Sequence, residues 1–96
     1  NCDLSKINIP NAFSPNGDQI NDFYRVTDYD GVVERFHILI YNRLGQKVFE
    51  SKNIFDYWDG RYDGNVLTNQ VFDFYLEIRC YGNKEFIYKG NINLIR

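Results

Sequence analysis

Residues 71–80 read VFDFYLEIRC. Apolar side chains occupy every second position from Phe72 to Cys80, while Asp73 and Glu77 stand between them. Because successive side chains of a β-strand point to opposite faces, this alternation predicts a strand with one buried and one solvent-facing side. Cys80 shares the apolar positions, so its sulfur is expected to point into the core.

A second alternating run, residues 85–95, follows a turn at Gly82 and Asn83. Two such runs joined by a glycine-containing turn predict a C-terminal β-hairpin. Gly90 interrupts the second run, and a glycine inside a strand is typical of a β-bulge. The positions expected to face the core are Phe86, Tyr88, Ile92 and Leu94.

Another hairpin is predicted earlier in the chain. Residues 34–41 alternate in the same way, residues 42–45 supply a turn, and residues 46–51 return. Residues 6–9 and 23–26 are further short strands. No segment repeats apolar residues at the spacing of an amphipathic helix. Six or seven short strands separated by Gly, Asn and Asp turns predict an all-β fold, an immunoglobulin-like β-sandwich of about seven antiparallel strands.

The composition fits one small domain. The chain has 96 residues, and its 8 Phe, 8 Tyr and 1 Trp provide large apolar side chains for a dense core. The net charge is −2 and Lys and Arg are scattered, which argues against nucleic-acid binding. No apolar run approaches the ~18 residues of a membrane-spanning helix, so we expect no transmembrane segment. The first residue is Asn1 rather than Met, and we expect residues 1–6 to end a linker and residues 7–96 to form the domain.

The sequence offers no set of catalytic residues, so we expect that the protein is not an enzyme. His37 is the only histidine and is expected on the solvent side of its strand. Asp56, Asp59 and Asp63 are candidates for the paired carboxylates of a glycoside hydrolase, but acidic residues are common in loops. Trp58 has the ring that stacks on carbohydrates, although the simpler interpretation places it in the core beside a tight glycine turn.

Cys2 and Cys80 are the only cysteines. In an exported protein they are expected to form a disulfide, which would close a loop of nearly the whole domain and stabilise it by about 4 kcal/mol. In the cytosol they would be two unrelated thiols. A disulfide requires that the two Cα atoms lie within about 7 Å of each other.

The loop at residues 14–22 is crowded with oxygen-bearing side chains. Asn16, Asp18, Asn21 and Asp22 suit Ca²⁺, which takes about 6–8 oxygen ligands. The spacing is not that of an EF-hand, and the simpler interpretation is a turn in which these side chains accept hydrogen bonds from nearby backbone N–H groups. The sequence therefore predicts no obligatory cofactor, with calcium as the alternative.

Five motifs occur in a fixed order along nearly the whole chain. They are IPNAFSPNGD (residues 9–18) with IND (20–22), ILIYNRLGQ (38–46), WDG (58–60), FDFYLE (72–77) and KGNINLIR (89–96). Together they resemble the gliding motility-associated C-terminal domain, the type B C-terminal signal of the type IX secretion system of Bacteroidetes. Gln19, Leu44 and Gln70 depart from the usual pattern of this family, and all three stand in expected turns or beside them.

The resemblance implies a non-catalytic targeting domain. Such a domain directs an exported cargo in the same chain, for example a gliding adhesin, across the periplasm and the outer membrane to the cell surface. The implied partners are the type IX translocon and a PorP/SprF-like outer-membrane β-barrel. The alternative function is a Ca²⁺-stabilised adhesive or carbohydrate-binding β-sandwich module.

The last strand is the expected partner-binding segment. At a sheet edge, its unpaired N–H and C=O groups would add to a strand of a receptor. As an internal strand, it would already be paired on both sides. Both alternatives stay open for a segment that comprises Asn91, Ile92, Asn93, Leu94, Ile95 and Arg96.

Overall fold

β-Strands and turns, without a helix, make up residues 7–14, 23–82 and 84–95, the part of the chain that this computed structural model describes. This confirms the all-β prediction for the described residues. The strands are β1 (Ile7–Asn8), β2 (Ala12–Phe13), β3 (Thr27–Asp28), β4 (Val33–Tyr41), β5 (Lys47–Ser51), β6 (Arg61–Tyr62), β7 (Asn65–Val66), β8 (Gln70–Cys80) and β9 (Lys84–Leu94).

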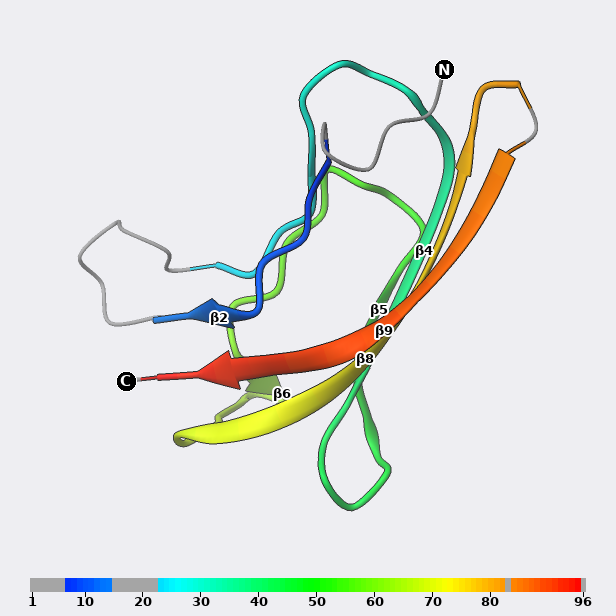
Figure 1. Cartoon of the computed structure of the whole chain (residues 1–96). Coiled ribbons are helices and arrows are strands. Elements are labelled where there is room, and N and C mark those ends of the chain that lie inside the picture. The colour runs from blue at the N-terminus through cyan, green and yellow to red at the C-terminus, as the bar shows by residue number, and fades with distance from the viewer. Residues whose placement is uncertain (1–6, 15–22, 83, 96) are drawn as a thin grey trace.

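A five-stranded sheet in the order β2-β9-β8-β4-β5 forms the first layer (Figure 1). Both predicted hairpins are present: β8 pairs with β9, and β4 pairs with β5, each antiparallel. The observed strands begin within one residue of the predicted ones. The other two pairings of this sheet were not predicted: β4 pairs antiparallel with β8, and β2 runs parallel to β9 on its other side.

The second layer is assembled from short pieces rather than long strands. It contains the antiparallel pairs β1–β3 and β6–β7 and an isolated bridge between Tyr24 and Trp58. The two layers confirm the sandwich, although the described residues form nine strands, several only two residues long, with one parallel pair. The expected strand at residues 23–26 is wrong: Tyr24 makes only the bridge, and the strand begins at Thr27.

Asp28 explains why the chain turns after β3. Its carboxylate accepts hydrogen bonds from the backbone N–H groups of Val32 at 3.1 Å and Val33 at 2.9 Å. A short Asp side chain that bonds backbone groups a few residues ahead is a standard way to close a turn. The chain therefore enters β4 directly from this turn.

The core lies between the layers and is rich in aromatic rings. Alternate residues of β8 from Phe72 to Cys80 are buried, which confirms the predicted inward face of this strand. Trp58 stands opposite them and is 2% exposed. Its ring lies 4.9 Å from that of Phe72, edge to face, and 5.4 Å from that of Phe13. Trp58 is thus a core residue, as the simpler interpretation had it.

Gly90 does not mark a bulge, which corrects the prediction from the sequence. The β8–β9 register runs without interruption through the pair Phe74 and Gly90. A Cβ atom at Gly90 would lie 2.9 Å from Cε1 of Phe74, because the phenyl ring crosses over the glycine. The ring of Phe74 also stacks on that of Tyr88, with centroids 5.8 Å apart. Close approach of a side chain, rather than backbone geometry, requires glycine here.

We expect Gly90→Ala to destabilise the domain by about 1 kcal/mol. Forcing an extra methyl group against a buried ring destabilises a protein by about 1–3 kcal/mol. Alanine also reduces the conformational entropy of the unfolded chain, which offsets part of this loss. Urea denaturation measures the change in the free energy of unfolding. In a Phe74→Leu background the same substitution should cost less, because the ring that it meets is gone. Equal costs in the two backgrounds would contradict the steric explanation.

Candidate functional site

The predicted C-terminal segment forms the end of β9 and alternates between core and solvent. Ile92 and Leu94 are 0% and 1% exposed and belong to the core. Asn91, Asn93 and Ile95 point outward on the opposite face. Arg96, the last predicted partner-binding residue, lies outside the described residues. The segment therefore presents alternate side chains to a partner, and the others hold the fold together.

The backbone of this segment is paired on both sides at Asn93 and Leu94. On one side, Leu94 pairs with Gln70 of β8. On the other side, the N–H of Asn93 donates to the carbonyl of Asn11 at 2.8 Å, and the N–H of Ile95 donates to the carbonyl of Phe13 at 3.0 Å. Of the two alternatives from the sequence, the structure favours the internal strand for residues 93–95. A partner meets side chains here rather than free backbone groups.

Strand β2 was missed by the sequence reasoning. Its two residues, Ala12 and Phe13, are too short a run for a period of two to be visible. The available signal was Phe13, an aromatic residue that follows Pro10 inside the first motif. It is buried and pairs with Leu94, so the N-terminal motif and the C-terminal motif are neighbours in space.

The predicted calcium ligands Asn16, Asp18, Asn21 and Asp22 lie outside the described residues. Within residues 7–14, 23–82 and 84–95, no group of three or more His, Cys, Asp or Glu side chains is placed to hold a metal ion. Calcium binding at the first loop therefore stays a prediction from the sequence.

Cys80 is buried and disulfide-bonded, with the inward orientation that its strand predicts. Cys2, its predicted partner, lies outside the described residues. The inward position of the Cys80 sulfur is confirmed, and the pairing with Cys2 stays a prediction.

The acidic loop that follows β5 has structural roles. Asp56 accepts a hydrogen bond from the Ser51 hydroxyl at 2.6 Å, and Asp59 accepts one from the backbone N–H of Arg61 at 3.1 Å. Trp58 donates its indole N–H to the carbonyl of Arg61 at 2.9 Å. These contacts shape the loop around the buried indole, and a buried ring is not available to stack on a carbohydrate.

The outward face of β4 and β5 carries a small charged cluster. His37 lies on this face, as predicted, and its Nε2 is 2.6 Å from Oε2 of Glu50. The ammonium of Lys47 donates to the other Glu50 oxygen at 2.6 Å. These hydrogen bonds, that of Lys47 first, lower the pKa of Glu50 to about 2. The cluster is solvent-accessible, so it orders the surface of the sheet more than it stabilises the fold.

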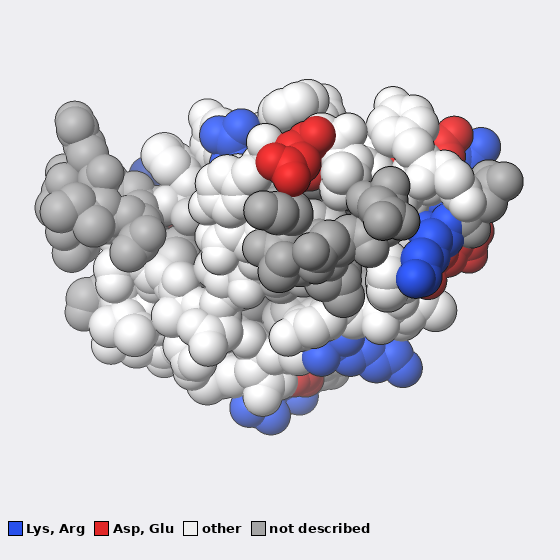
Figure 2. Space-filling view, turned by 45° about the horizontal axis from the view of Figure 1, so that its top comes forward, with Lys and Arg blue, Asp and Glu red and all other residues white. Residues whose placement is uncertain are grey.

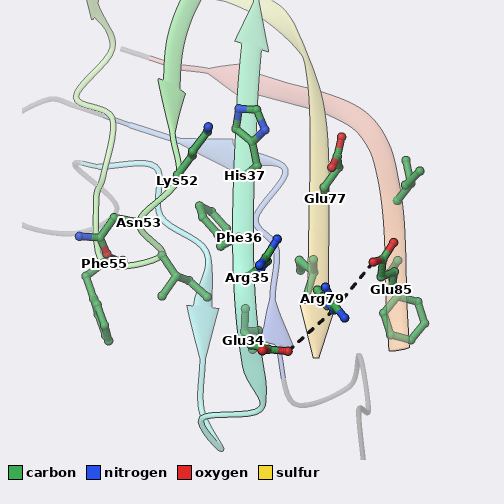
Figure 3. A pocket seen from close by; sticks show the side chains of 15 residues that line it. Glu34, Arg35, Phe36, His37, Lys52, Asn53, Phe55, Glu77, Arg79 and Glu85 are labelled. Atoms are coloured by element: carbon green, nitrogen blue, oxygen red, sulfur yellow. Dashed lines mark hydrogen bonds and ion pairs between the residues drawn. The ribbon is translucent and has the colours of Figure 1, made fainter. Parts of the chain in front are cut away.

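An open hollow of about 850 Å³ lies at the end of the sheet near the β8–β9 turn (Figure 3). This end is opposite to the C-terminal segment. Strands β4, β8 and β9 and the residues after β5 line it. Arg79 stands between two acids, with Nε 3.8 Å from Oε1 of Glu34 and 3.9 Å from Oε1 of Glu85. Because acidic and basic side chains alternate around the hollow, it has no excess of one sign to hold a charged ligand.

Charged side chains of both signs are distributed in small groups over the face shown in Figure 2. The expectation that nucleic acid is not a partner rests on the net charge of −2 and the scattered Lys and Arg, and it stays a prediction from the sequence. No helix among the described residues has the length and apolar character to span a membrane.

Comparison with family models matches residues 7–94 to the CHU_C type IX secretion signal domain, and the chain belongs to this family. It is therefore a secretion-targeting domain. Domains of this class are targeting signals rather than catalysts, and they imply contact with the secretion machinery and export across the outer membrane. No curated protein matches the chain.

We expect the pKa of Glu50, measured by NMR titration of its carboxyl carbon, to lie near 2. Lys47→Ala should raise it more than His37→Ala does, because the bond from Lys47 contributes most. The lowered pKa means that this cluster's contribution to stability is present above about pH 4.5 and is lost as the pH falls towards 2. Lys52 is an exposed lysine outside the cluster, so Lys52→Ala should leave the pKa of Glu50 unchanged. A larger effect of His37→Ala would contradict the assignment.

Proposed function

We propose that this domain is a folded export signal whose surface, rather than its linear C-terminal sequence, is recognised by a PorP/SprF-like outer-membrane barrel that serves the type IX translocon. The cargo is an upstream region of the same chain, such as a gliding adhesin, and its destination is the cell surface. The family membership supports the targeting role, and the geometry of β9 supports recognition of a folded surface.

The observation that carries the proposal is the burial of Ile92 and Leu94. A receptor that bound the last strand as an extended peptide would have to withdraw both side chains from the core. Complete burial of a Leu or Ile side chain is worth about 1.5–3 kcal/mol, so the withdrawal would cost a large part of the stability of a small domain. Binding to the intact surface avoids this cost.

The surface that remains for a receptor combines residues from distant parts of the sequence. Asn91, Asn93 and Ile95 face outward, and Ile95 is 51% exposed. Ala12 of β2 pairs with Asn93 and stands beside it. Because β2 and β9 meet only in the folded domain, this combination reports that the domain has folded.

We expect the double variant Asn91→Ala/Ile95→Ala to reduce surface display of a fused reporter several-fold, because truncating central contact side chains weakens binding most. Display is measured by protease accessibility of the reporter in cells that contain the secretion system, with and without the candidate barrel. The melting temperature of the variant should stay within a few degrees of the original, since both side chains are exposed.

The matched control is Arg35→Ala/Lys52→Ala, which also truncates two exposed side chains. Both residues lie at the opposite end of the sheet, near the β8–β9 turn. This variant should be displayed normally. Normal display of Asn91→Ala/Ile95→Ala would overturn the proposal. Deletion of residues 91–96 is the weaker experiment, because it removes two core side chains and so confounds loss of the fold with loss of the contact.

The calcium-stabilised adhesive module is the competing function, and metal removal separates the two. We expect a chelator to leave the melting temperature unchanged, since the sandwich core is built from apolar contacts. A fall in melting temperature on chelation that added Ca²⁺ reverses, and that Asp18→Asn/Asp22→Asn abolishes, would instead support the calcium site. Differential scanning fluorimetry measures both outcomes.

A further inference from the structure

In the described part of the chain, strand β9 leaves one edge of the central sheet without a partner strand over most of its length. Among the described residues, β2 covers this edge only at Asn93 and Leu94. From residue 84 to residue 91, β9 pairs with β8 on one side and with no described strand on the other. Unpaired N–H and C=O groups along such an edge favour the addition of another strand.

The pairing with β2 identifies the backbone groups that face this open edge. Asn93 and Ile95 donate their N–H groups towards β2. Backbone groups of a strand alternate between its two sides, so those of Glu85, Ile87 and Lys89 point in the same direction. These three residues are exposed, and Ile87 is 64% exposed.

This edge is complementary to itself. If a second copy runs antiparallel with its Ile87 opposite Ile87, then Glu85 of each copy stands opposite Lys89 of the other. All three positions are of the kind that exchange two backbone hydrogen bonds with the residue opposite. On the other face of the sheet the same register places Phe86 opposite Tyr88. Opposite charges and aromatic pairs across neighbouring strands are both stabilising.

Other arrangements lose this match. A shift by two residues would place Ile87 opposite Lys89 and leave Glu85 without a cation. A parallel arrangement would place Glu85 opposite Glu85, and like charges directly opposite are destabilising. Ile87 also lies near the middle of the open stretch, between the turn that precedes Lys84 and the strand β2.

We propose that this edge of β9 is a self-association surface, on which a second copy of the chain pairs antiparallel about Ile87 to form one continuous sheet. Among the described residues, Glu85 and Lys89 make weak surface contacts in the single copy. The ammonium of Lys89 lies 5.5 Å from the centre of the Tyr75 ring, and Glu85 is 3.9 Å from Arg79. The inference goes beyond the secretion role and does not depend on the identity of the receptor.

Reversing the charge of Glu85 or Lys89 tests both the surface and the register. Dimerisation of the 96-residue chain is measured by sedimentation velocity, in a concentration series that reaches about 1 mM. The original chain should dimerise reversibly. Glu85→Lys and Lys89→Glu should each raise the dimer dissociation constant at least about tenfold, because each turns two attractive pairs into repulsive ones. An equimolar mixture of the two variants should associate again, as should the double variant Glu85→Lys/Lys89→Glu.

Lys84→Glu is the matched control, because it makes the same charge change on the same strand but stands opposite Gly90 of the second copy. It should dimerise as the original chain does, and circular dichroism should show that every variant is folded. A chain that stays monomeric throughout the series overturns the proposal, as do single variants that dimerise normally or a mixture that fails to associate. Binding of a receptor strand to this edge by a domain that is itself monomeric would also overturn it.

Discussion

The hydrogen bonds between Asn11 and Asn93 join the N-terminal part of the domain to its last strand. The two residues are 82 positions apart in the chain. The carbonyl of Asn11 accepts from both the backbone N–H and the side-chain amide of Asn93. This contact sets β2 beside β9 and brings Phe13 next to Leu94 and the ring of Trp58. The place of Phe13 in the aromatic core, the pairing of Asn93 and Leu94 on both sides and the composite outward surface all depend on it.

The rest of the sheet combines the local hairpins β4–β5 and β8–β9 with the pairing of β4 and β8, which joins residues 33–41 to residues 70–80. The hairpins β4–β5 and β8–β9 close over short turns, whereas the β2–β9 pair must join distant parts of the chain. Closing such a long loop costs more conformational entropy than closing a hairpin and is slower. The outward surface is therefore a property of the completed fold, since the hairpins alone do not supply β2.

The long strands could be predicted because each has one face in the core and one in solvent. Phe72, Leu76 and Ile78 reveal β8 through their period of two, and the burial in the structure follows it. The short elements could not be predicted in this way. A two-residue strand such as β2 has no period, and the bridge at Tyr24 depends on the position of Trp58, which the local sequence does not encode.

Gly90 shows the limit of interpreting one residue by its local sequence. A glycine within an alternating run fits a bulge as well as it fits a site where a ring passes close to the backbone, and only the packing of Phe74 distinguishes them. The sequence left open whether the last strand, the candidate surface, is internal or at a sheet edge. The internal position of residues 93–95 depends on a partner strand that the sequence did not reveal.

The mixed distribution of charge has a kinetic consequence. With 11 basic and 13 acidic residues and a net charge of −2, the domain generates little long-range field to guide an approaching molecule. Encounters with any protein partner then proceed at the ordinary rate of unguided diffusion, about 10⁵–10⁶ M⁻¹s⁻¹, and depend little on ionic strength. Discrimination between right and wrong partners must consequently reside in how slowly a well-fitted complex comes apart.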